Sequence, residues 1–203
     1  MNTNIKTVAK LAAFAGAFAL TGCAYIPRNV HPTYVPSAQV QKIPGAENVK
    51  LTVVVHNDKK HHDKDLVSYT IAPAGFETAG VYMRVAKDFK AALSAALKDR
   101  GFHVVKASSK VVKLDINHFW FKAHTGWWIH QDGEVQADLS VIKHNAGVIY
   151  HKNISIDVAG KESPGLFKFD NEHRSAEAEV LLDKTILKII NAKGFINAII
   201  SKR

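Results

Sequence analysis

The chain has 203 residues and a formal net charge of +9 at neutral pH, with 27 Lys and Arg against 18 Asp and Glu. Its single cysteine, Cys23, excludes a disulfide within the chain and disfavours a thiolate metal site, which needs several Cys or His ligands. This length suits one domain that is large enough to bury a hydrophobic core.

Residues 1–22 have the pattern of a secretory signal peptide. Lys6 and Lys10 precede ten uncharged, mostly apolar residues, LAAFAGAFAL, and this run is too short to span a bilayer. Residues 20–23, LTGC, which begin at the last leucine of this run, resemble the lipobox of bacterial lipoproteins. The resemblance implies cleavage before Cys23 and acylation of this residue, so that two or three acyl chains hold the protein permanently on a membrane. The alternative is an ordinary signal peptide that has a cysteine near its cleavage site.

The residue after the cysteine bears on the destination of the protein. Ala24 stands where an Asp would retain an enterobacterial lipoprotein in the inner membrane, so resemblance to those sorting rules implies the outer membrane, with the domain facing the periplasm. Nucleic acid is therefore not an expected partner, although the chain is basic. The positive charge instead suits membrane lipid, lipopolysaccharide phosphates or acidic proteins, or forms a solvated surface without a specific partner.

Residues 23–48 are expected to comprise the acylated cysteine and a Pro-rich tether. Pro27, Pro32, Pro36 and Pro44 recur without a helical or strand period. Extended at about 3.1 Å per residue, such a tether would hold the domain up to roughly 75 Å from the membrane. Alternatively, the segment lies along the domain or a neighbour through apolar contacts such as Tyr34.

Residues 49–203 are expected to form one α+β domain. β-branched and alternating runs predict strands over residues 49–56, 67–73, 102–106, 111–121, 134–144 and 148–160. Apolar residues at steps of three and four predict helices over 81–100, ending at Gly101, and over 175–192, before Gly194 and a short amphipathic end. This order favours a single antiparallel sheet with two helices packed on one face.

These features together resemble the YajG-like family of small bacterial lipoproteins. The resemblance rests on the lipobox, the tether, the helix ending LKDRGFHVV, the strands that follow and the late helix, and it covers about residues 49–199. A related layout occurs in auxiliary lipoproteins of envelope transport systems. The family supplies no catalytic residues and no settled activity. The chain departs from it in a His-rich loop, a Trp pair and the insertion KESPGLFKFD.

The His-rich loop HNDKKHHDKD offers a candidate metal site. Imidazoles and carboxylates bind zinc, copper or nickel, and the candidate ligands are His56, His61, His62 and Asp63. The spacing lacks a helical His pair, and the intervening lysines repel a cation. A solvated loop without metal is therefore the favoured interpretation, and no cofactor is expected besides the covalent lipid on Cys23.

The aromatic segment HFWFKAHTGWWIHQDG offers a candidate protein-binding surface, with Trp127, Trp128 and Trp120 as its candidate contact residues. Trp127 and Trp128 are neighbours near a hairpin end, where successive side chains point to opposite faces, so one of them is expected to be exposed. Exposed Trp is favoured at protein interfaces and at the head-group level of membranes. The alternative is a hairpin whose aromatics pair with Trp120 to fix the register.

The sequence contains no phosphate-binding Gly-rich loop, nucleophile elbow or paired His motif on a helix. We therefore expect a lipid-anchored envelope protein that is not an enzyme and binds another envelope component, as an accessory or structural subunit. The alternative is a periplasmic module that binds a metal or an anionic glycolipid.

Overall fold

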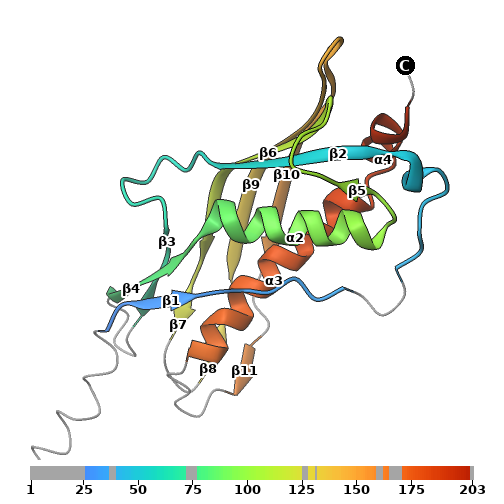
Figure 1. The fold of residues 1–203 in the computed structure, drawn as a ribbon. Coiled ribbons are helices and arrows are strands. Elements are labelled where there is room, and N and C mark those ends of the chain that lie inside the picture. Colours follow the sequence, from blue (N-terminus) through green and yellow to red (C-terminus); the bar gives the residue numbers. More distant parts are fainter. Residues whose placement is uncertain are drawn as a thin grey trace, which may run out of the picture.

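The computed structural model describes residues 26–36, 40–71, 77–124, 128–130, 132–158, 162–164 and 171–201, of which the side chains of 123–130, 162–164 and 171–174 are outside the description. Three α-helices and eleven strands lie in these ranges, confirming the α+β class (Figure 1). The strands are β1 (Arg28–Val30), β2 (Lys50–Asn57), β3 (Leu66–Ile71), β4 (Glu77–Met83), β5 (His103–Val104), β6 (Lys110–Phe121), β7 (Ala123–His124), β8 (Trp128–His130), β9 (Gly133–Lys143), β10 (Gly147–Val158) and β11 (Glu162–Pro164). The helices are α2 (Val85–Asp99), α3 (Asn171–Ile190) and α4 (Lys193–Ile200), with a 3-10 turn, η2 (Ala46–Asn48), before β2.

The expected single antiparallel sheet is wrong, because the strands form two mixed sheets and a short pair. The larger sheet has the order β10-β9-β6-β2-β5, in which β2 is parallel to β6 and to β5, and the other pairs are antiparallel. The smaller sheet has the order β1-β4-β3-β7, and β8 pairs with β11. The parallel pair β2/β6 follows from the chain path, since β3, β4 and α2 lie between these two strands and form a crossover.

The first predicted helix begins four residues later than its apolar spacing indicated. Val81 continues the helical period back from Val85, but it belongs to β4 and pairs with Ser68 of β3. The predicted end at Gly101 is confirmed. Gly101 has a φ of 99°, and the Phe102 N–H donates to the Leu97 carbonyl oxygen at 3.1 Å. A residue in this left-handed conformation ends a helix and is favoured to be glycine.

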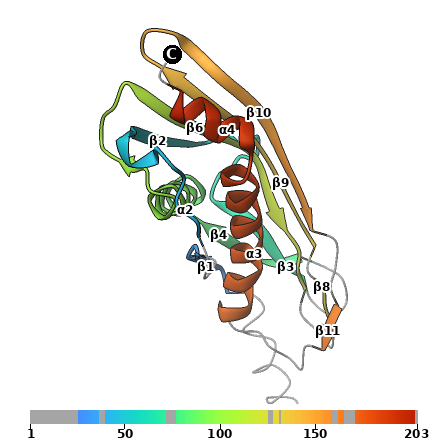
Figure 2. The ribbon, with the colours of Figure 1, turned by 90° about the vertical axis from the view of Figure 1, so that its right-hand side faces the viewer.

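The late helices divide before Gly194 rather than at it. α3 ends at Ile190, residues 191–192 form the connection, and Gly194 lies inside α4. All three helices lie on one side of the larger sheet, as Figure 2 shows. None of the described helices is long and apolar enough to cross a membrane.

The core lies between these helices and the larger sheet. The first part of β6 turns Val112, Leu114 and Ile116 inward, each 0% exposed. Register shifts by one residue between Ile116 and His118, so the inward positions beyond this bulge are Phe119 and Phe121. Phe119 packs edge to face on Phe89 of α2, with ring centroids 5.5 Å apart. The bulge therefore reverses which alternate residues of β6 face the core.

The described part of residues 26–48 lies along the domain. β1 pairs in parallel with β4. Val30 and Ala46 are 0% exposed, and Tyr34 is 8% exposed. The Ile43 N–H donates to the Arg100 carbonyl oxygen at 2.9 Å, at the end of α2. The described residues of this segment therefore lie along the domain, as the second expected arrangement had it, and do not form an extended tether.

Candidate functional site

Trp120 stands on the outer face of β6, beside the loop that joins β2 to β3. Without the bulge, Trp120 would share the inward face of Ile116, whereas the register shift turns it outward. Its ring meets Tyr69 of β3 edge to face, with centroids 5.7 Å apart, and His61 of the loop lies 6.4 Å away. Trp120 is thus held by neighbours from two other segments of the chain.

A cleft of about 700 Å³ opens beside this Trp. Its lining mixes aromatic, amide and cationic side chains with one carboxylate. The lining residues are Asp58, Lys59, Lys60, His61, Leu66, Asn117, His118, Phe119, Trp120 and Gln136. A second, shallower hollow of about 370 Å³ shares His118 and Trp120 with the first and extends toward Lys122 and Asp157. The two hollows meet at the His118 and Trp120 side chains.

Lys59 fixes the floor of the cleft. Its side chain is 5% exposed, and its ammonium donates a hydrogen bond to the Leu66 carbonyl oxygen at 2.6 Å. Burial lowers the pKa of Lys59 to about 8, although Asp65 and Asp63 act in the opposite direction. The loop between β2 and β3 is therefore built around a buried lysine, which a sequence of mostly charged residues did not indicate.

His56 and Asp115 form the best candidate metal position among the described residues. His56 Nδ1 lies 2.8 Å from an Asp115 carboxylate oxygen, and the candidate ligand atoms of His56, Asp58 and Asp115 lie within 4.8 Å of one another. Lys113 Nζ donates to the other Asp115 oxygen at 2.7 Å and competes with a cation there. Donor types suit zinc or copper. The trio joins His56 and Asp58, from the start of the His-rich segment, to Asp115 of β6.

Asp115 and Asp138 are directly opposite each other across β6 and β9. Opposed like charges destabilise a sheet, so each carboxylate needs its own donors. His56 Nδ1 and the Lys113 ammonium each contact one carboxylate oxygen of Asp115. The amides of Asn117 and Asn153 each donate to Asp138 at 2.7 Å. This polar network covers the outer face of the sheet next to the cleft.

The structure distributes the predicted site residues unevenly. Trp120 and His61 line the cleft, and His56 joins the trio with Asp115. His62 and Asp63 are exposed in the loop and are absent from that trio. Cys23 and Trp127 lie outside the described residues, and Trp128 begins β8 with its side chain outside the description.

Sequence reasoning missed Lys59, Tyr69, Asp115, Asn117 and Gln136. For Asp115, Asn117 and Gln136 a signal was available, because all three occupy the polar side of an alternating strand.

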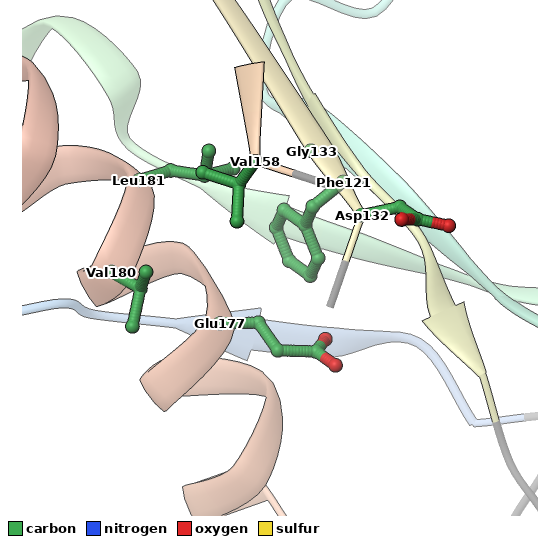
Figure 3. A pocket seen from close by; sticks show the side chains of 7 residues that line it. All are labelled: Phe121, Asp132, Gly133, Val158, Glu177, Val180 and Leu181. Carbon is green, nitrogen blue, oxygen red and sulfur yellow. The ribbon is translucent and has the colours of Figure 1, made fainter. Parts of the chain in front are cut away.

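Two further hollows are separate from the cleft, and the first of them is too small for a large ligand. Where α3 faces the ends of β6, β9 and β10, Phe121, Val158 and Leu181 enclose a pocket of about 10 Å³, with room for roughly one water (Figure 3). At the other end of the sheet, a hollow of about 380 Å³ includes Lys50, Lys110 and Lys143. Lys110 there donates to the carbonyl oxygen of Ile199 in the last turn of α4 and, at 3.2 Å, to that of Ser201 just after the helix.

No protein-family model and no curated protein matches the chain. The expected membership of the YajG-like family therefore stays a prediction.

Among solved structures, a Xanthomonas campestris protein of the family DUF330 is similar to this chain, with 12% sequence identity and a TM-score of 0.52. The match covers 83% of this chain and 95% of that protein. PelC from Paraburkholderia phytofirmans, described as a dodecamer, has 12% identity, 80% and 95% coverage and a TM-score of 0.42. A Helicobacter pylori protein, described as a neuraminyllactose-binding hemagglutinin homolog, has 13% identity, 84% and 97% coverage and a TM-score of 0.43. At these identities the first similarity shows a shared fold.

Proposed function

We propose that the chain is a lipoprotein of the bacterial outer membrane that binds another envelope component from the periplasmic side, as a non-catalytic accessory subunit. The lipobox LTGC supports the anchor at Cys23. The observation that carries the binding role is the outward position of Trp120 at the edge of a cleft of about 700 Å³.

The bulge in β6 supports a recognition role for Trp120. A large aromatic side chain gains most by packing in the core, whereas here Phe119 takes the core position and Trp120 is left half-buried at the surface. Trp is enriched among the interface residues that contribute most of the binding free energy, and these residues sit in well-packed pockets. Lys60, His61 and His118 in the lining favour a partner that presents acidic groups.

The test is mild cross-linking in native membranes, followed by detergent extraction and mass spectrometry of what co-purifies with the tagged protein. Trp120→Ala is the variant, and Val148→Ala, which removes a side chain 60% exposed and outside the cleft, is the matched control. We expect a stoichiometric partner with the wild type and Val148→Ala and its loss with Trp120→Ala. Equal recovery with a folded Trp120→Ala variant would place the contact elsewhere. Cys23→Ser tests whether assembly needs the anchor.

An anionic glycolipid is the alternative ligand of the same cleft, because cationic and aromatic groups there also suit an acidic sugar. Lipid analysis of the same purified sample separates the two, since a glycolipid would be recovered without a stoichiometric protein.

A divalent metal is a second candidate, favoured by the trio His56, Asp58 and Asp115. Calorimetric titration with zinc tests it. Heat that is lost in His56→Ala and kept in His62→Ala would support the trio, and no heat with the wild type would remove it.

A further inference from the structure

The N-terminal segment enters the fold five residues after Cys23. β1 begins at Arg28, and it runs parallel to β4 with Arg28 opposite Val81 and Val30 opposite Met83. Val30 is 0% exposed, so this first strand is a fixed part of the domain rather than a spacer.

Further contacts hold the described residues that follow. The Val35 N–H donates to the Asp183 carboxylate on α3. Tyr34 is 8% exposed, and burial together with nearby Asp99 and Asp183 raises the pKa of its hydroxyl. Releasing this segment would expose these side chains to water and break the pairing with β4, both of which cost free energy.

The chain between Cys23 and Arg28 therefore sets how far the domain can stand from an acylated cysteine. An extended chain spans at most about 3.3–3.6 Å per residue, so these five steps reach no more than about 18 Å. This reach is about a quarter of the roughly 75 Å that an unpacked Pro-rich tether would give.

Strand pairing shows which end of the domain is nearest to this anchor. Because β1 is parallel to β4, the N-terminal end of β1 lies on the side of the start of β4 at Glu77. Glu77 pairs with Ile71, and Ile71 pairs with His124 of β7. The turn 144–146 between β9 and β10 lies at the opposite end of the molecule, as Figure 1 shows.

We propose that the end of the domain carrying Glu77 and the start of β1 faces the lipid surface at a distance of no more than about 20 Å, while the turn 144–146 points away from the membrane. The proposal rests on the proposed lipidation of Cys23. Trp120 pairs with Glu134, one residue from the Gly133 end of β9, so the cleft opens in the half of the domain near the membrane. Its partner is then a lipid head group or a protein held at the membrane surface.

The single native cysteine makes this orientation measurable. Acylation occupies the Cys23 thiol, so a cysteine introduced by Glu77→Cys or Asn145→Cys is the one thiol left for a fluorescent label. Both positions are exposed. The scale of their separation is set by β9, which ends two residues before Asn145 and spans roughly 35 Å, at eleven residues of about 3.3 Å each.

Each labelled, lipidated protein is reconstituted into phosphatidylethanolamine and phosphatidylglycerol vesicles that carry an energy acceptor on a lipid head group. We expect energy transfer at least about threefold stronger from position 77 than from position 145, given the length of the sheet between them. A flexible Gly/Ser insertion of about 20 residues after Ala24 is the control, and it should abolish the difference because the domain can then turn freely. Equal transfer from both positions without the insertion would overturn the orientation.

The intact mass of each purified protein separates this proposal from the lipidation on which it rests. An unmodified Cys23 would overturn both. An acylated Cys23 with equal transfer from the two labels would overturn the orientation alone and leave the proposed function standing.

Discussion

The backbone N–H of Val35 donates a hydrogen bond to the Asp183 carboxylate, and this bond joins the N-terminal segment to α3. One Asp183 carboxylate oxygen is buried without a hydrogen-bond partner among the described residues. Burial, with the nearby charge of Glu179, raises the pKa of Asp183 from 3.8 to about 6, and the Val35 N–H offsets only part of this rise. We therefore expect the contact between the N-terminal segment and α3 to depend on pH.

The first prediction concerns this carboxyl group. Between pH 3.8 and about 6 the folded state binds more protons at Asp183 than the unfolded state does, so its contribution to stability is full below 3.8 and is lost as the pH rises through 6. Asp183→Asn removes this dependence. We expect the free energy of unfolding of the wild type, relative to Asp183→Asn, to fall by about 1–2 kcal/mol between pH 4 and 7, after allowance for partial solvent screening. Urea unfolding at several pH values measures it, and parallel curves would contradict it.

The second prediction concerns Lys59. Its folded-state pKa of about 8 lies below the ordinary value of 10.5, so between these values the unfolded state binds more protons and stability rises with pH. Below pH 8 both states are charged and the cost of burying the ammonium is fully present. We expect Lys59→Met to lack this rise, and the wild type to gain stability relative to it from pH 8 to 10. Deprotonation keeps the hydrogen bond, because the neutral amine can still donate to the Leu66 carbonyl oxygen. A fall in the free energy of unfolding of the wild type relative to Lys59→Met from pH 8 to 10 would therefore refute the prediction.

The third prediction tests the bulge in β6 with two neighbouring residues. Phe119 is 0% exposed, whereas the His118 side chain is 44% exposed. We expect Phe119→Ala to lower the free energy of unfolding by about 3–5 kcal/mol, because it leaves a cavity against Phe89. His118→Ala, the matched control, should change it by no more than about 0.5 kcal/mol. Denaturant unfolding of both variants checks the pair, and similar costs would mean that the register is wrong.

The fourth prediction concerns the end of α2. A Cβ added at Gly101 would approach the Ala46 Cβ to 3.6 Å, an ordinary contact, so the cost of substitution comes from the φ of 99°. We expect Gly101→Ala to destabilise by about 1 kcal/mol. Gly101→Asn should cost less, because Asn tolerates the left-handed region. Thermal unfolding ranks the two, and an equal cost would point to packing rather than to backbone conformation.

Much of the fold follows from local patterns in the sequence. Runs of β-branched residues or alternation located β2, β6, β9 and β10, and the spacing of apolar residues located α2 up to its glycine end. The partners of the strands did not follow, because parallel pairing of β2 with β6 depends on how the intervening chain crosses the sheet. Val81 was assigned to the helix because a buried strand residue and a buried helix residue satisfy the same apolar spacing over one turn.

The candidate site was only partly predictable for a related reason. Histidine density drew attention to His56, His61 and His62. Of these, His56 bonds to Asp115, which is 59 residues away in the sequence and was not predicted as its partner. Trp120 was expected either as a contact residue together with the Trp pair or as their register partner. Its outward position depends on one extra residue in β6, and nothing in the alternation before Ile116 announces that residue.

The bulge has an evolutionary consequence. The bulge sets which face each of the last four residues of β6 occupies. Deletion of Asn117 would therefore bury His118 and Trp120 and expose Phe119 and Phe121. A loss of one codon would thus cost both the core and the cleft. Substitutions of exposed cleft residues, such as Lys60 and His61, carry no such penalty, and they leave the chemistry of the cleft open to divergence on an unchanged scaffold.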